Sequence, residues 1–200
     1  MDILKLDRTA ALETVRLLEH ATPEDWTRPT PCAGWTLHDL VAHLAGRHHG
    51  FAAAAAGGGA ARGVWLPPAL GGDPVAAYRS ATAAVLDAFA RPGVLTREFS
   101  LPEISTGTRF PATVAIGYHF LDLVVHGWDV ARTLGIPLEL DLATTEAALL
   151  FALRVPDDER RLEPAPAFRP ALPAATHASP LDLALAALGR SPAWSAPASL

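Results

Sequence analysis

Residues 111–134 read PATVAIGYHFLDLVVHGWDVARTL, and Gly135 and Pro137 follow them. The apolar residues of this stretch recur every three or four positions, which predicts a long helix rather than a strand. A glycine and then a proline directly beyond the last periodic residue are the expected stop signal of a helix. The stretch therefore predicts one long member of an all-α fold.

Four further stretches show the same helical period, whereas alternating β-branched runs are scarce. One of them has a clear start, because Thr36 is a candidate N-cap and Asp39 lies three residues later, as in a capping box with Asp in place of Glu. Between residues 94 and 108 we expect an irregular chain with at most a short extended piece. The four additional helices are expected at 6–20, 37–57, 74–90 and 143–153.

The C-terminal part differs in composition from the rest. Residues 155–180 are rich in proline and predict an irregular crossing, and residues 181–190 predict a short last helix. A chain of 200 residues can bury about 70% of its surface as one unit. We therefore expect a single domain over residues 1–200: a four-helix bundle with extra short helices and a Pro-rich C-terminal crossing.

Composition and charge narrow the class of protein. The net charge of -5 argues against nucleic acid as the main partner, because phosphate binding needs a basic face. We find no apolar run of about 18 residues and no secretory signal, so we expect neither a membrane span nor export. The single cysteine, Cys32, fits a reducing cytoplasm. The abundance of apolar residues is compatible with a homodimer.

Three residues form the candidate site. Asp122 and His126 are four residues apart, so they share one face of the predicted helix, and apolar residues surround them. His43 is also flanked by apolar residues on the second helix. If these helices are neighbours, two imidazoles and one carboxylate converge, a set that suits zinc first, and also nickel or iron(II). Three protein ligands leave a position for water or substrate.

The spacing alone leaves an alternative open, in which Asp122 and His126 form an ordinary polar contact that joins helices. His119 shares the stripe of Asp122 and is a weaker candidate ligand. His48 and His49 are weaker still, since they cannot both share the face of His43. His20 and His177 are expected on the surface, near turns.

Other residues that attract notice are predicted to have structural roles. Trp35 and Trp128 are interpreted as core aromatics, and Cys32 as a small buried residue rather than a reactive thiol. Asp129 and Arg132 are expected either to pair or to be solvated. The charged run at residues 157–161 is interpreted as an exposed face.

Two motifs resemble a known family. Residues 30–44, TPCAGWTLHDLVAHL, and residues 122–131, DLVVHGWDVA, resemble the DinB-like proteins related to the N-terminal domain of mycothiol-dependent maleylpyruvate isomerase. The ending LGRSP at residues 188–192 is similar to a close of that family. The resemblance implies a DinB-like bundle with a metal bound by His43, Asp122 and His126. It also implies mycothiol as a co-substrate.

The chain departs from the family pattern in two respects. Asp122 stands where the isomerase has Glu, and the isomerase is expected to continue into a C-terminal domain that is replaced here by the crossing and the short helix. Maleylpyruvate isomerisation is therefore not assumed. For a substrate carboxylate, Arg47, one turn after His43, is the residue that spacing suggests.

Three hypotheses on function remain at this point. The first is an enzyme in which the metal activates a low-molecular-weight thiol toward an electrophilic substrate, in thiol transfer or isomerisation, or a hydroxide in hydrolysis. The second is a metal-binding module without catalysis. The third is a helical interaction domain without metal. No catalytic side chain is assigned.

Overall fold

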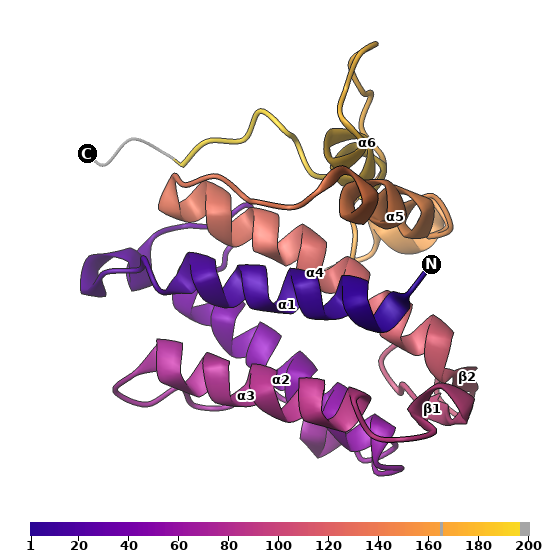
Figure 1. The fold of residues 1–200 in the computed structure, drawn as a ribbon. Coiled ribbons are helices and arrows are strands. Elements are labelled where there is room, and N and C mark those ends of the chain that lie inside the picture. Colours follow the sequence, from indigo (N-terminus) through magenta and orange to yellow (C-terminus); the bar gives the residue numbers. More distant parts are fainter. Residues whose placement is uncertain (165, 197–200) are drawn as a thin grey trace.

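The computed structural model describes residues 1–164 and 166–196, which fold mainly into helices (Figure 1). The prediction of an all-α bundle is confirmed. The α-helices are α1 (Ile3–Leu18), α2 (Leu37–Ala55), α3 (Pro74–Phe89), α4 (Ala112–Leu134), α5 (Leu142–Ala152) and α6 (Pro180–Ala187). The 3-10 helices are η1 (Pro23–Thr27), η2 (Arg62–Trp65), η3 (Val94–Thr96) and η4 (Glu159–Leu162), and the strands are β1 (Glu98–Ser100) and β2 (Arg109–Pro111).

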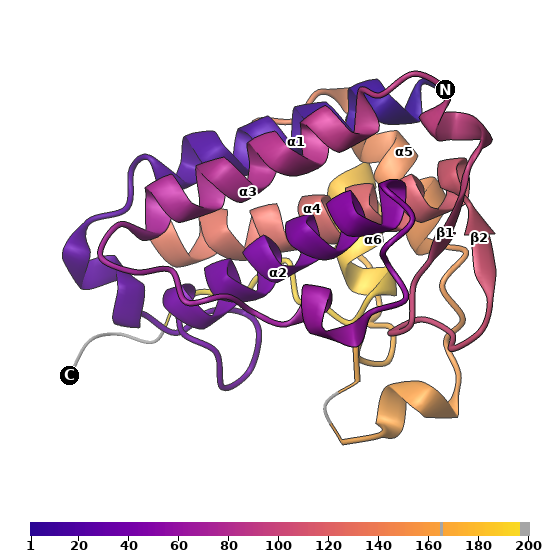
Figure 2. The ribbon, with the colours of Figure 1, turned by 90° about the horizontal axis from the view of Figure 1, so that it is seen from below.

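The first four α-helices form the bundle. Helix α1 packs against α3 and α4, and α2 packs against the same two helices from the other side, as Figures 1 and 2 show. Large apolar side chains of these helices, such as Leu17 and Leu40, are fully buried. The long helix α4 touches α1, α2 and α5, so any side chain on its inner faces meets residues from distant parts of the chain.

Helix α2 begins where the sequence predicts. The Thr36 side chain accepts a hydrogen bond from the backbone N–H of Asp39, and the Asp39 carboxylate accepts one from the backbone N–H of Thr36 at 2.9 Å. This capping box satisfies helix donors that would otherwise lack partners. It sets the helical register of His43, which follows one turn later.

The segment before α4 contains more structure than predicted. Strands β1 and β2 pair antiparallel, with Phe99 opposite Phe110, and enclose the loop at residues 101–108. Phe99 is fully buried and anchors the hairpin to the bundle. Strand β1 is the short extended piece expected between residues 94 and 108, but the pairing with β2 and the 3-10 helix η3 were not predicted, and the hairpin leads directly into α4.

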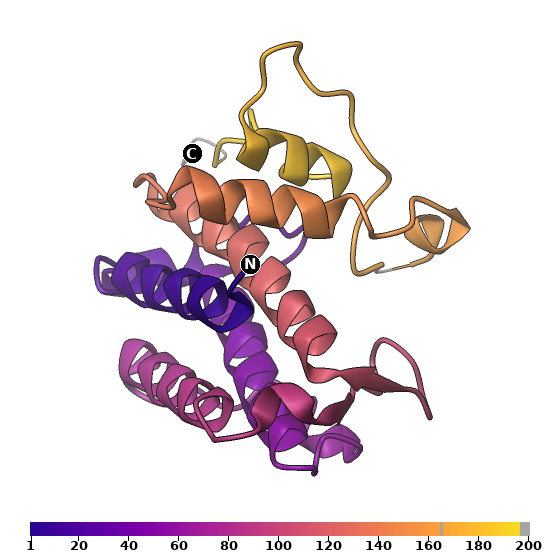
Figure 3. The same cartoon turned by 45° about the vertical axis from the view of Figure 1, so that its right-hand side comes forward.

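Helix α5 packs against α4, and α6 packs along α5, with a long connection between α5 and α6 (Figure 3). This connection is the proline-rich crossing, and it contains η4. The last helix ends at Ala187, earlier than predicted, because Gly189 takes a left-handed conformation with φ of 76°.

One charged side chain organises this crossing. We expected residues 157–161 to form an exposed face, and this is wrong for Arg161, which is only 5% exposed. Its guanidinium donates hydrogen bonds to four backbone carbonyls, those of Val155, Pro156, Arg169 and Ala187. Arg161 therefore ties the crossing to the end of α6. Among the described residues, no helix has the length and apolar character needed to cross a membrane.

Candidate metal centre

His43, Asp122 and His126 lie together between α2 and α4. The imidazole rings of His43 and His126 have centroids 5.3 Å apart, and Nε2 of His126 is 3.5 Å from Oδ1 of Asp122. Each of the three residues offers a donor atom, and these atoms all lie within 4.8 Å of one another. The two helices that the sequence predicts as neighbours do bring the three side chains to one place.

The three side chains fit a divalent cation. Zinc bonds of about 2.1 Å in a tetrahedron place donor atoms about 3.4 Å apart, which small rotations from the present geometry can reach. Oδ2 of Asp122 is buried and has no hydrogen-bond partner among the described residues. A buried carboxylate oxygen without a partner is costly, and a cation would remove that cost. Metal binding itself stays a prediction.

A further carboxylate fixes the orientation of His126. Its Nδ1 lies 2.8 Å from Oδ2 of Asp129, to which it donates a hydrogen bond in the neutral tautomer, and Nε2 then points a lone pair toward Asp122. Arg190 in turn holds Asp129, with Nε 3.2 Å from Oδ1 and Nη2 3.1 Å from Oδ2. A carboxylate behind a ligating histidine is typical of metal sites.

The sequence does not indicate this role of Asp129. We expected Asp129 and Arg132 either to pair or to be solvated: they do not pair, and Asp129 is fully buried against Arg190, whereas Arg132 is exposed. Arg132 instead lies over the ring of Trp128, 5.5 Å from its centroid, and donates to the carbonyl of Pro192. The only signal for Arg190 in the sequence is the Gly-Arg dipeptide in the C-terminal motif.

Cys32 also belongs to this cluster, and its interpretation as a simple buried residue is wrong. Its half-buried thiol donates to Asp129 at 3.2 Å and accepts from Arg190 at 3.3 Å. Cys32, His126 and Asp129 form a second group with the spacing of metal ligands. The Arg190 guanidinium already supplies a positive charge there, so it opposes a cation in this group. The group with His43 is the better candidate.

The pKa values of the two histidines move in opposite directions. Burial lowers the pKa of His43 to about 4, and the nearby charge of Asp122 only partly offsets this. Burial also disfavours the charged form of His126, but the carboxylates of Asp122 and Asp129 outweigh it and raise its pKa to about 10. At neutral pH His43 thus offers a free lone pair, whereas a metal must displace a proton from His126.

The two tryptophans differ from each other. Trp128 is buried at 6% exposure, as predicted, but Trp35 is 36% exposed, so its assignment to the core is wrong. Trp35 lies over the site, with its ring centroid 4.9 Å from that of His43 and 6.5 Å from that of His126. It therefore shields the two imidazoles from solvent on one side.

The weaker histidine candidates lie elsewhere. His119 is fully buried, and its Nδ1 is 2.6 Å from the carboxylate of Asp7 on α1 while its Nε2 is 2.9 Å from Nδ1 of His48. This chain of hydrogen bonds joins α1, α4 and α2 inside the bundle. The side chains of His20, His49 and His177 are exposed.

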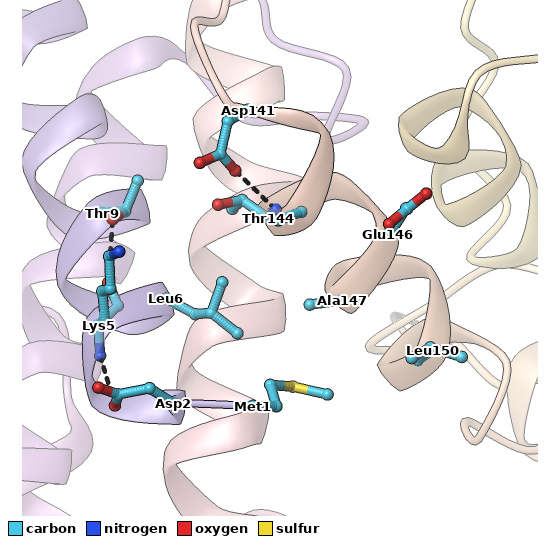
Figure 4. Close-up of a pocket in the computed structure, with 11 residues that line it drawn as sticks. Met1, Asp2, Lys5, Leu6, Thr9, Asp141, Thr144, Glu146, Ala147 and Leu150 are labelled. Carbon is cyan, nitrogen blue, oxygen red and sulfur yellow. Dashed lines mark hydrogen bonds between the residues drawn. The ribbon is translucent and has the colours of Figure 1, made fainter.

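A surface groove of about 400 Å³ lies away from this cluster, between the start of α1 and α5 (Figure 4). Two of its acidic side chains serve as helix caps, because Asp2 accepts from the backbone of Lys5 and Asp141 from that of Thr144. None of the three candidate ligands lines it. The groove therefore does not compete with the metal centre as a site for chemistry.

Comparisons with known proteins identify the family of the chain. Residues 8–131 match the family model of the mycothiol maleylpyruvate isomerase N-terminal domain. Two proteins of Mycobacterium tuberculosis, from strains CDC 1551 and H37Rv and described only as uncharacterized, are each 32% identical over 95% of this chain and 98% of their own length.

Solved structures show the same fold. The crystal structure of a mycothiol-dependent maleylpyruvate isomerase superposes with a TM-score of 0.65 at 15% identity, over 98% of this chain and 90% of that one. A histidine-to-alanine mutant of such an isomerase superposes with a TM-score of 0.64, over 95% of this chain and 89% of that one. The matched length spans nearly all of this chain and nine tenths of the isomerase. The family model itself ends at residue 131, before α5 begins, and a different C-terminal part in the isomerase stays an expectation.

Proposed function

The chain belongs to the family of the mycothiol maleylpyruvate isomerase N-terminal domain, and on this premise we propose that it is a metal-dependent enzyme acting with a low-molecular-weight thiol. The observation that carries the proposal is the convergence of His43, Asp122 and His126 around a buried carboxylate oxygen that has no partner within the described part of the chain. Two imidazoles and one carboxylate suit zinc, with nickel and iron(II) as alternatives.

Three protein ligands would leave one position for a substrate atom. A divalent cation held there would lower the pKa of a thiol, so that the thiolate is available at neutral pH. The protein's own contribution is orientation: Asp129 fixes the ring of His126, and Arg190 fixes Asp129. Trp35 lies over both imidazoles and limits the access of water on that side.

Mycothiol is the thiol that the family and the superposed isomerase point to. The reaction class we propose is attack of the thiolate on an electrophilic carbon. In thiol transfer the new C–S bond replaces the bond to a leaving group such as chloride, whereas in isomerisation the thiolate adds to a double bond and is expelled again. A reducing cytoplasm, where such thiols are kept as thiols, is the compartment that fits this chemistry.

The test is a pair of assays on the purified full chain, loaded with zinc or treated with a chelator. Mycothiol is supplied with monochlorobimane, to follow thiol transfer, and separately with maleylpyruvate, to follow isomerisation by absorbance. We expect at least one activity, lost with chelator and in the variants His126→Ala and Asp122→Ala. His49→Ala, an exposed histidine on the same helix as His43, should retain it.

Two results would overturn the proposal in different ways. A zinc-loaded protein that is inactive in both assays would leave a metal-binding module without this catalysis. A protein that binds no metal would leave a helical interaction domain in which Asp122 and His126 form a polar contact.

A further inference from the structure

Arg47 lies beside the candidate metal centre. Helices α2 and α4 run antiparallel at this point, because His43 lies next to His126 whereas His48, further along α2, lies next to His119. Arg47 follows His43 by four residues and so projects from nearly the same face of α2. Its place along α2, between His43 and His48, sets it opposite Asp122. Burial lowers the pKa of Arg47, and the charge of Asp122 partly offsets this.

The guanidinium of Arg47 is anchored by neighbouring groups, but one of its N–H donors has no partner among the described residues. It stacks over the ring of Trp65 with a distance of 5.4 Å to the centroid, and Nη2 donates to the Trp65 carbonyl at 3.3 Å. Nη1 forms an ion pair with the carboxylate of Glu103. Its Nε is buried and has no partner among the described residues, although the side chain is 16% exposed.

Arg161 shows what a purely structural buried arginine looks like in this protein. Its guanidinium donates to four backbone carbonyls, and its Nε has a partner in the carbonyl of Pro156. Arg47, by contrast, keeps one buried N–H without a partner among the described residues, which is unfavourable. A second carboxylate oxygen, from Glu103 or from a ligand, would satisfy this donor in a two-point contact.

The carboxylate of Glu103 can be displaced from its ion pair with Arg47. It belongs to the loop at residues 101–108 between β1 and β2, and its side chain is 40% exposed. Ile104 beside it is 52% exposed, and the loop is linked to η2 by a hydrogen bond from Arg62 to Thr106. Because the Glu103 carboxylate is partly exposed and belongs to a surface loop, a competing anion can reach it and displace it from Arg47.

We propose that Arg47 binds the carboxylate group of an anionic substrate next to the metal centre, and that Glu103 occupies this position as an internal competitor until the substrate arrives. The proposal rests on the proposed function for what happens to the bound substrate, but anion binding by Arg47 does not itself require the metal. Arg47 acts as a specificity residue, since a neutral electrophile would leave its charge paired with Glu103.

The experiment uses maleate as the probe, titrated into the metal-free, ¹⁵N-labelled full chain and followed by NMR. The affinity is read from backbone amide shifts in α2, and the Arg47 Nε–H signal reports on the unused donor. We expect Glu103→Gln to bind maleate at least tenfold more tightly than the unchanged protein, and Arg47→Gln at least tenfold more weakly than Glu103→Gln. Arg62→Gln, which also removes a contact to the loop, should bind as the unchanged protein does.

Unchanged binding in Glu103→Gln, or retained binding in an Arg47→Gln variant in the Glu103→Gln background, would overturn the proposal. If Arg47→Gln does not fold, Arg47→Lys keeps the charge and loses the fork, and tenfold weaker binding is again expected. Metal titrations run in parallel separate the two claims. Maleate binding in a protein that binds no metal would overturn only the proposed function. Metal binding in a protein whose maleate affinity does not change in Glu103→Gln would overturn only this inference.

Discussion

Among single residues, Asp129 has the largest influence on the candidate site without being a ligand. It accepts a hydrogen bond from Nδ1 of His126 and so decides which ring nitrogen faces Asp122. We predict that Asp129→Asn lowers the affinity for zinc by about 10–100-fold, the usual effect of losing such a partner. Competition with a chromophoric chelator measures this, and an unchanged affinity would show that Asp129 does not orient the ligand.

The exposure of Trp35 changes the stability expected for its substitution. A core tryptophan replaced by alanine costs about 3–5 kcal/mol, and this range applies to Trp128. Trp35 is 36% exposed, so Trp35→Ala should lower the free energy of unfolding by less than about 2 kcal/mol. Urea denaturation of both variants gives the comparison, and equal losses would place Trp35 in the core after all.

At the level of the helices, two local signals predict helix ends correctly, whereas α1 begins and ends two to three residues earlier than predicted. The capping box at Thr36 and the glycine at Gly135, with φ of 72°, place the start of α2 and the end of α4 correctly. Gly50 is different, because a Cβ there would lie 2.2 Å from the Trp65 ring. Nothing near Gly50 in the sequence indicates this contact, since Trp65 belongs to another element.

Helix α2 should be measurably weakened when its cap is removed. We predict that Thr36→Ala lowers the free energy of unfolding by about 1 kcal/mol, because a backbone N–H loses its acceptor. Asp39→Ala should have a similar effect, and the double variant should lose less than the sum, since both changes break the same box. Strict additivity in thermal unfolding would mean that the two residues act independently.

Over the whole molecule, the sequence predicts which helices form and which two carry the site. It does not predict how distant segments complete the site. Arg190 reaches Asp129 from 61 residues away, and Glu103 reaches Arg47 from the hairpin loop. Such contacts have no period or spacing, because they depend on how packed elements meet. They become visible only once α4, the C-terminal segment and the hairpin are in place.

The stability of the metal-free protein should depend on pH with a maximum near the ordinary histidine pKa of 6.5. Burial lowers the pKa of His43 to about 4 and that of His48 well below 6.5, so below pH 6.5 the unfolded chain binds protons that the fold does not. Each of these two histidines then lowers the free energy of unfolding by about 1.4 kcal/mol for each unit by which the pH falls. The pKa of His126 is raised to about 10, so this residue affects stability above pH 6.5. There the folded protein holds a proton that the unfolded chain has released, and the free energy of unfolding falls as pH rises.

Urea denaturation between pH 4.5 and 9 measures both limbs, using protein kept free of metal. His48→Gln, which can still contact His119, should remove about half of the slope on the acid side. His126→Gln should flatten the alkaline side only. A stability that rises steadily from pH 6.5 to 9 in the metal-free protein would contradict the charge state assigned to His126.

The most direct test of the central claim is the metal content of the full chain purified without chelator, measured by mass spectrometry. We predict about one divalent ion per chain, either zinc, nickel or iron(II). The content should fall to less than about a tenth of that in His43→Ala, Asp122→Ala and His126→Ala. His49→Ala should keep the full content. A protein that carries no metal and takes up none on titration, or three variants that bind as the unchanged chain does, would contradict the account.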